Sequence, residues 1–177
     1  MNNVVIKKRV QAYNIDALNR TAKCDEDIQN GCVFVLNKQS EVDGEGMVWI
    51  AEKPTADATG LWMATSPEVV IVKDAMGNEY KGMTTDPRAF VNNAGRMIDA
   101  TKLVEGDVVL MSGEGITGIS ETANVYLVPS TEYVLTVSSS AGTGFCLQKV
   151  GTERISIGTG AIAKTPIMGY KFVCKKN

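Results

Sequence analysis

The sequence contains no histidine. Histidine is the usual general base near neutral pH and the commonest metal ligand in proteins. Its absence excludes Ser-His-Asp and Cys-His nucleophile arrangements and the zinc sites that need imidazole ligands. Carboxylates and lysines can still perform acid–base chemistry. Because the commonest catalytic designs are excluded, we expect a protein that is not an enzyme.

Long apolar runs and a strong charge bias are also absent. No segment approaches the roughly 20 consecutive apolar residues of a membrane span, and the N-terminus lacks an apolar stretch of signal-peptide length. The net charge is −2 and the pI is near 5.3, whereas nucleic-acid binders carry clustered basic surfaces. We therefore expect a cytosolic protein with no membrane and no direct nucleic-acid partner.

The four cysteines match neither a metal site nor a disulfide framework. Seven residues separate Cys24 from Cys32, more than the two to four of a zinc-binding pair, and Cys146 and Cys174 lie farther apart still. Thiols of cytosolic proteins stay reduced. We expect all four to be reduced, mostly buried and used as small apolar residues, with no metal and no cofactor.

The segment CDEDIQNGCVFVL, from Cys24 to Leu36, is rich in acids near its start. As a calcium loop it fails at the most specific positions, where Asn30 replaces glycine and Leu36 replaces glutamate. Asn30-Gly31 favours a turn, and the β-branched and aromatic residues that follow favour a strand. The segment therefore predicts the entrance to a buried strand.

Short apolar segments bounded by Gly, Pro, Asn and Asp recur along the chain. Residues 69–74, VVIVKD, are apolar on both faces for a few positions and predict a central strand. The one helix signal lies near residues 87–94, with Asp86 as N-cap, Pro87 at the first helical position and Gly95 as stop. We predict an all-β fold, an antiparallel barrel or sandwich with one short helix.

The length of 177 residues suits a single β domain over residues 1–177. A soft boundary near residues 82–100 leaves a second option, two small β subdomains at about 1–85 and 96–177. No repeat of fixed period divides the chain further.

Two glycine-rich segments share only part of a phosphate-binding motif. GEGITG, residues 113–118, has the glycine spacing of a dinucleotide fingerprint, but a turn and a strand follow it where the fingerprint needs a helix. SSSAGTG, residues 138–144, lacks the Lys-Ser/Thr ending of a P-loop. We interpret the first as a flexible tip between strands and the second as a hairpin tip.

Paired acids and tryptophans are the remaining candidates for chemistry on glycans. The pairs are Asp43 with Glu45 and Glu105 with Asp107. They lie in Gly-rich turns, where acids are common for structural reasons. Trp49 and Trp62 can stack on a sugar, but tryptophans in such strands more often belong to the core. A glycan-binding module or glycan-acting enzyme therefore stays as a minor alternative.

Several segments occur in one characteristic order along most of the chain. They are an acidic I-x-N-G strand entrance (28–31), a strand end K-P-T (53–55), a PEV strand (67–69), F-x-N-x-A-G with a following arginine (90–96), a GD strand (106–107), and the closing segments GTGFCLQKVG (142–151) and GYKFVCKK (169–176). This order resembles the small virion structural proteins of tailed bacteriophages that are encoded beside the major capsid protein. The segment 70–83 is longer than the resemblance implies.

The resemblance implies a capsid decoration or head auxiliary protein that lies on the outer surface of the virion after synthesis in the host cytoplasm. Its implied partner is the major capsid protein, and self-association, including a trimer around a lattice symmetry axis, is also expected. A tail or head–tail connector protein is the alternative in the same class. The family supplies no catalytic residues.

The start of the chain is the candidate capsid contact. Its residues are Val4, Val5, Ile6, Lys7, Lys8 and Arg9. An N-terminal strand with no hairpin partner nearby can add to the sheet edge of a neighbour, and its basic residues can meet an acidic capsid surface. The alternative is that this strand pairs within the protein's own sheet.

Overall fold

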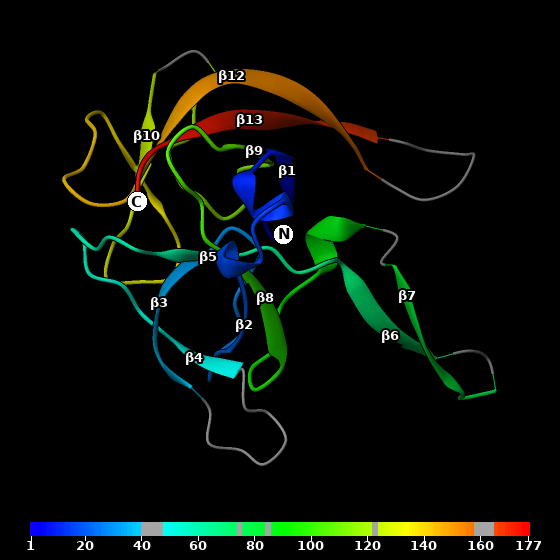
Figure 1. The fold of residues 1–177 in the computed structure, drawn as a ribbon. Helices are drawn as coiled ribbons and strands as arrows, with labels where there is room; N and C mark the ends of the chain where they lie inside the picture. The colour runs from blue at the N-terminus through cyan, green and yellow to red at the C-terminus, as the bar shows by residue number, and fades with distance from the viewer. Residues whose placement is uncertain (40–47, 74–75, 84–85, 122–123, 158–164) are drawn as a thin grey trace.

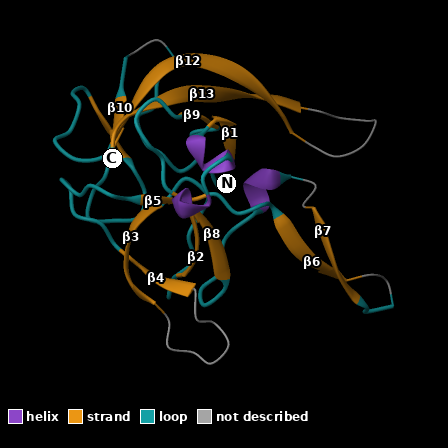
Figure 2. Ribbon diagram, viewed as in Figure 1, coloured by secondary structure: helices purple, strands orange, loops and turns teal. Residues whose placement is uncertain are grey.

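The chain folds into a barrel, a larger sheet and a separate ribbon. The computed structural model describes residues 1–39, 48–73, 76–83, 86–121, 124–157 and 165–177. A six-stranded sheet has the order β1-β9-β13-β12-β10-β11, a closed barrel has the order β2-β4-β3-β5-β8, and β6 pairs with β7 (Figures 1 and 2). The predicted all-β fold is confirmed.

The six-stranded sheet is antiparallel throughout. Its strands are β1 (Val5–Arg9), β9 (Val108–Met111), β13 (Thr165–Lys176), β12 (Cys146–Ile157), β10 (Tyr126–Val128) and β11 (Thr136–Ser138). β9 pairs with only the Tyr170–Val173 part of β13, and β10 with only Leu147 and Gln148 of β12. Among the described strands, the two arms of the distal part of the β12–β13 hairpin pair only with each other, and this part reaches past β1 (Figure 1).

The barrel has one parallel pair, a difference from the predicted antiparallel arrangement. Its strands are β2 (Asn19–Lys23), β4 (Val48–Glu52), β3 (Val33–Gln39), β5 (Trp62–Ala64) and β8 (Met97–Thr101). β2 and β4 run parallel, and the other four neighbouring pairs are antiparallel. A barrel of this size encloses little space, and four of the side chains in its buried cluster are alanines. The buried cluster of the barrel includes Ala22, Ala51, Ala64, Ala100, Phe34 and Ile98.

A second buried cluster joins the barrel to the six-stranded sheet. Successive strand residues point to opposite faces, so Val33 and Met63 point away from the barrel cluster that their neighbours occupy. They pack in one cluster with Leu127, Leu147 and Phe172 of the sheet. All five side chains are at most 1% exposed. The two units therefore share a core.

Both units take strands from both parts of the chain. β1 joins a sheet whose other strands begin at Val108, and β8 closes a barrel whose other strands end at Ala64. The expected soft boundary near residues 82–100 does not separate the two sheets.

The strand expected at the centre of a sheet lies outside both main units. β6 (Val69–Lys73) and β7 (Glu79–Met83) pair with each other and with no other strand of the described chain. This ribbon projects from the body (Figure 1). The prediction of a central strand was wrong, because a β-branched run favours extended backbone wherever it lies and does not report its neighbours.

The expected helix near residues 87–94 is reduced to the 3-10 turn η3 (Pro87–Ala89). Its predicted N-cap is confirmed, since the Asp86 carboxylate accepts a hydrogen bond from the Arg88 backbone N–H at 2.9 Å. The chain is extended again at Phe90, which is 8% exposed and belongs to the buried residues. The signals for a helix start were therefore correct, while burial of Phe90 ends the turn early.

Two further 3-10 turns, η1 (Gln11–Tyr13) and η2 (Asp16–Leu18), connect β1 to β2. Ala12 of η1 is 5% exposed and belongs to the shared core. Among the described residues, no helix has the length and apolar character needed to cross a membrane.

The loop at residues 138–144 is not the hairpin tip that the sequence suggests. β11 pairs with β10, so the loop leads from the sheet edge back to β12. The Phe145 N–H donates to the Ala58 carbonyl at 2.8 Å. A Cβ on Gly144 would lie 2.4 Å from the carbonyl oxygens of Asp57 and Ala58, so only glycine permits this approach of two backbones.

We expect Gly144→Ala to destabilise the protein by about 1–3 kcal/mol, because the added methyl group forces two backbone segments apart. Gly151→Ala is the matched control, since a Cβ there meets nothing within 4 Å, and we expect it to change stability by less than about 0.5 kcal/mol. Urea unfolding measures both values. Equal stability of the two variants would contradict the close approach at Gly144.

Candidate functional site

The candidate capsid contact at the N-terminus is a strand of the protein's own sheet. β1 pairs with β9, with Val5 opposite Met111 and Ile6 opposite Leu110. Val4 is 4% exposed. The sequence left two possibilities, a strand that adds to a neighbour's sheet and a strand that pairs within the protein's own sheet. The structure shows the second, so this segment is not a free arm. Whether its exposed side chains touch a capsid stays a prediction.

The basic residues of β1 differ in their surroundings. Lys8 and Arg9 are exposed and Lys7 is partly buried. Lys8 pairs with Glu153 of β12, which also lies 3.2 Å from Lys171. Hydrogen bonds from these two lysines, that from Lys8 first, lower the pKa of the Glu153 carboxyl. Charged side chains along an edge strand disfavour pairing with further strands.

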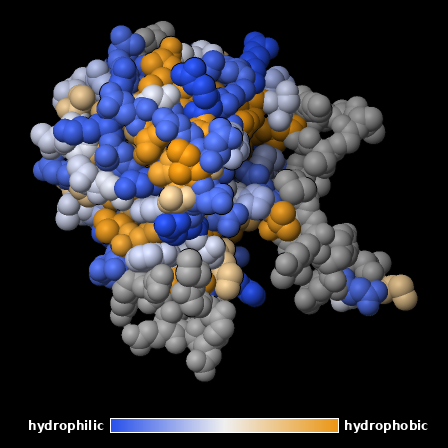
Figure 3. All heavy atoms as spheres, in the orientation of Figure 1, coloured by the Kyte–Doolittle hydropathy of each residue, from blue (hydrophilic) through white to orange (hydrophobic). Residues whose placement is uncertain are grey.

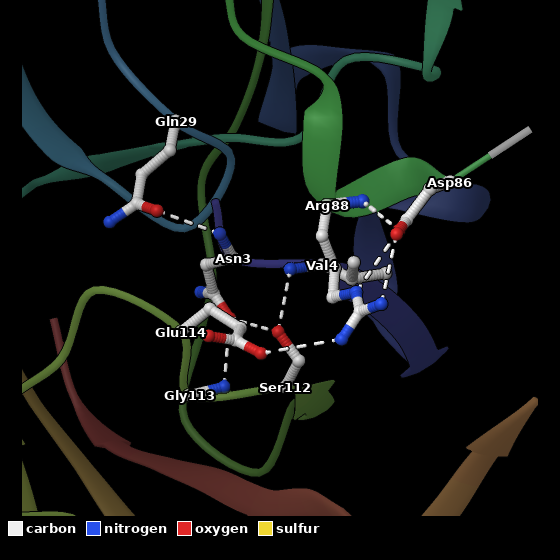
Figure 4. A network of polar contacts seen from close by, with 8 residues as sticks. All are labelled: Asn3, Val4, Gln29, Asp86, Arg88, Ser112, Gly113 and Glu114. Carbon is white, nitrogen blue, oxygen red and sulfur yellow. Dashed lines mark hydrogen bonds and ion pairs between the residues drawn. The ribbon is translucent and has the colours of Figure 1, made fainter. Parts of the chain in front are cut away.

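A buried asparagine fastens the N-terminus to three parts of the fold (Figure 4). Asn3 is 3% exposed. Its backbone N–H donates to the Gln29 side chain at 2.7 Å, and its side-chain oxygen accepts from the Ser112 hydroxyl at 3.1 Å and the Gly113 N–H at 3.0 Å. Ser112 in turn accepts from the Val4 N–H at 2.9 Å. These contacts join the β3 entrance, the end of β9 and β1.

The two ends of the β6–β7 ribbon meet this polar network. Before the ribbon, the Asn30 side chain donates to the Ser66 carbonyl at 2.8 Å and accepts from the Ser66 N–H at 3.1 Å. After the ribbon, Asp86 pairs with Arg88 at 2.9 Å, and this hydrogen-bonded guanidinium holds the pKa of the Asp86 carboxyl below its usual range. Arg88 also lies 3.8 Å from Glu114. Asn30 thus holds the chain before the ribbon, and the Arg88–Glu114 pair links the chain after the ribbon to the loop that follows β9.

The stretch from Cys24 to Leu36 has the predicted structural role. Gly31 has a φ of +86° in the turn before β3, so the expected strand entrance is confirmed. All four cysteines are free and buried. Burial raises the pKa of the Cys32 and Cys174 thiols to about 12 and also raises that of Cys146. These thiols are therefore protonated at neutral pH and poor nucleophiles. No cluster of three potential metal ligands occurs among the described residues.

The loop at residues 113–118 consists of turns, and the described residues between it and β10 form no helix, but it is not a loose tip. Ile116 is 7% exposed and belongs to the shared core. The buried Lys149 ammonium donates to the carbonyls of Ser120 and Glu121 and so holds the continuation of the loop. Ile116, the apolar residue at the centre of the loop, is the sequence signal from which this packing could have been predicted.

Those candidates for glycan chemistry that the structure describes have separate structural roles. Asp43 and Glu45 lie outside the described residues. Asp107 is 2% exposed and accepts from two backbone N–H groups, those of Gln11 and Val104, so it stabilises the predicted turn at Glu105–Asp107. Trp62 packs against the barrel cluster. Trp49 has a buried indole N–H with no partner among the described residues.

An open groove of about 550 Å³ runs beside the barrel over Tyr133, and neither tryptophan lines it. Lys53 crosses it, 3.0 Å from Glu26 and 2.8 Å from Glu132. Hydrogen bonds that Lys53 donates to these carboxylates, Glu132 first, raise the pKa of Lys53. The ammonium that crosses this groove is thus already bound by two carboxylates of the protein.

The fold defines an all-β protein in which a closed five-stranded barrel shares its core with a six-stranded sheet. Comparison of the chain with protein-family models, with curated proteins and with solved structures found no match. Sequence reasoning missed Asn3, Asn30 and Gln29 as structural centres, because isolated amides carry no periodic signal.

We expect Asn3→Ala to reduce the free energy of unfolding by about 1–3 kcal/mol, because it leaves the buried Ser112 hydroxyl and Gly113 N–H without their acceptor. The control is Asn14→Ala at an exposed position, for which a change below about 0.5 kcal/mol is expected. Denaturant unfolding followed by tryptophan fluorescence compares them. A neutral Asn3→Ala would argue against the network in Figure 4.

We also expect stability to fall at alkaline pH. The folded-state pKa values of Cys32 and Cys174 are raised from 9.0 to about 12, so the unfolded chain loses its thiol protons first. Their contribution is complete below pH 9 and is lost as the pH rises from 9 towards 12. The melting temperature, measured from pH 8 to 10.5, should decline less steeply in Cys32→Ala than in the unchanged protein. Parallel declines would contradict the assigned cause.

Proposed function

We propose that this protein is a structural protein of a tailed-bacteriophage virion that binds the outer surface of the capsid lattice and stabilises the head. The order of sequence segments described above supports this role. The supporting structural observation is the β6–β7 ribbon, which pairs with no other strand of the described chain. An isolated two-stranded hairpin is marginally stable in water. Contact with a neighbouring subunit would stabilise it.

The major capsid protein is the neighbour in this proposal. A ribbon can add to a sheet edge or lie in a surface groove of its partner. Its flanking segments are held by Asn30 on one side and, on the other, by the contacts of Arg88 with Glu114 and with the Asn2 N–H, which lowers the conformational freedom lost on binding. Because the protein would bind only the assembled lattice, binding stabilises that state by mass action. Self-association around a symmetry axis, for instance as a trimer, would multiply these contacts.

A tail or head–tail connector protein is the alternative in the same class. Copy number separates the two roles, since decoration needs many copies in each head and a connector only a few. A glycan-binding module has less support, because one face of the half-buried Trp62 lies against the barrel cluster and two cations lie over its ring.

The test uses heads assembled without this protein and the purified full chain. We expect the chain to bind at many copies per head and to raise the temperature at which heads release their DNA. A variant with residues 69–83 replaced by a short Gly-Ser linker should stay folded and lose at least tenfold in affinity, a change of about 1.4 kcal/mol or more. Val150→Ser, which removes an exposed apolar side chain outside the ribbon, should bind normally.

Cryo-EM of the decorated heads gives the copy number and position. Absence of binding by the unchanged chain would refute the decoration role, and occupancy confined to the head–tail vertex would favour the connector. Full binding by the linker variant would exclude the ribbon as the lattice contact.

A further inference from the structure

Three cations lie near one another between β1 and the barrel without a carboxylate partner in the described part of the chain. Lys7 is on β1, Arg20 is on β2, and Lys102 follows β8. The ion pairs found among the described residues use the cations Lys8, Lys53, Arg88 and Lys171. The three cations near the barrel therefore form no ion pair with a carboxylate of the described chain.

Aromatic rings hold these cations in place. The Lys7 ammonium lies 5.5 Å from the ring centre of Tyr13, and Arg20 and Lys102 lie 5.7 and 6.0 Å from that of Trp62. We call these five residues the cation–aromatic surface. A ring face attracts a cation and restricts it without cancelling its charge. The surface is thus positively charged and partly ordered before any partner arrives.

A groove connects the two ring-bound groups of cations. It is open, has a volume of about 420 Å³, and is lined by both Lys7 and Arg20. Asp99 is the one acid in its lining, and all its lining residues belong to the described chain. The Arg20 guanidinium also donates to the Asn19 carbonyl at 2.8 Å, which orients it at the groove. A carboxylate entering the groove therefore meets two cations and one acid.

Exposed apolar side chains lie beside the same cations. Tyr13 is 62% exposed and Ile15 is 43% exposed. The Asn19 side chain, from the groove lining, donates to the Ala12 carbonyl at 2.7 Å and so keeps this segment next to the groove. On the face seen in Figure 3, apolar groups are small and lie between hydrophilic ones. Tyr, Trp and Arg together are enriched at protein–protein interfaces.

We propose that the cation–aromatic surface binds a carboxylate-rich segment of a partner protein. Arginine binds carboxylates through paired hydrogen bonds, and the ring-held lysines add charge without a large loss of side-chain freedom. A long polyanion fits less well, because the whole chain has a net charge of −2 and Asp99 lies in the groove. The inference rests on the proposed function only for the identity of the partner, an acidic stretch of the capsid lattice.

The first test measures binding of a fluorescein-labelled peptide of alternating aspartate and serine to the isolated full chain by fluorescence anisotropy. We expect the double variant Arg20→Gln/Lys102→Gln to bind about tenfold more weakly, since two charge contacts of partly buried side chains together contribute about 1.4 kcal/mol. The control Arg154→Gln/Lys175→Gln removes equal charge from exposed positions on β12 and β13 and should change affinity less than twofold.

Several results would overturn the proposal: no peptide binding by the unchanged chain, equal weakening in the control, or tighter binding of a thymidine oligonucleotide through the same residues. Lys7→Gln on β1 serves as the second variant if the double variant melts early. With heads in place of peptide, normal binding by the charge variants would exclude the surface and leave the decoration role intact. Failure of the unchanged chain to bind heads would refute the decoration role. The peptide measurement would then still decide whether the cation–aromatic surface binds carboxylates.

Discussion

The fold depends on two neighbouring strands, β3 and β5, that each serve two cores. Phe34 and Ala64 belong to the barrel cluster, while the adjacent Val33 and Met63 belong to the cluster shared with the six-stranded sheet. Alternation along a strand makes this possible, because neighbouring side chains leave on opposite faces. A shift of one residue in the β3–β5 register would exchange the two sets and disrupt both cores at once.

Because the two units share this core, a network of buried polar side chains can hold the surrounding loops in fixed positions. Asn3, Asn30 and Asn92 are each at most 4% exposed, and their amides bond with backbone or side-chain groups of other loops. A buried amide is stable only when its donors and acceptors are satisfied, which requires that the surrounding loops stay in register. The shared core fixes the relative positions of these loops. The segments that flank the β6–β7 ribbon are bound to the same loops and are therefore fixed as well.

Local signals in the sequence predicted local structure well. The strand entrance at Asn30-Gly31, the cap at Asp86 and the turn at Glu105–Asp107 each depend on a few adjacent residues. The barrel strands β2 and β8 gave little signal, because a narrow interior selects alanine at Ala22 and Ala100, where wider cores take β-branched residues. The run in β6 was assigned to the wrong place, since its residues report strand propensity and carry no information on which sheet, if any, they join.

The cation–aromatic surface was beyond sequence reasoning for a similar reason. Tyr13 lies close to Lys7 in the chain, but Arg20 and Trp62 are brought together only when the barrel closes. The lysines of the N-terminal basic segment have different partners. Lys8 forms an ion pair with Glu153, while the adjacent Lys7 lines the groove and has no ion pair in the described chain. One short basic sequence, interrupted by a register shift between Lys7 and Arg9, thus supplies both an ion pair within the protein and a charge that lines the groove.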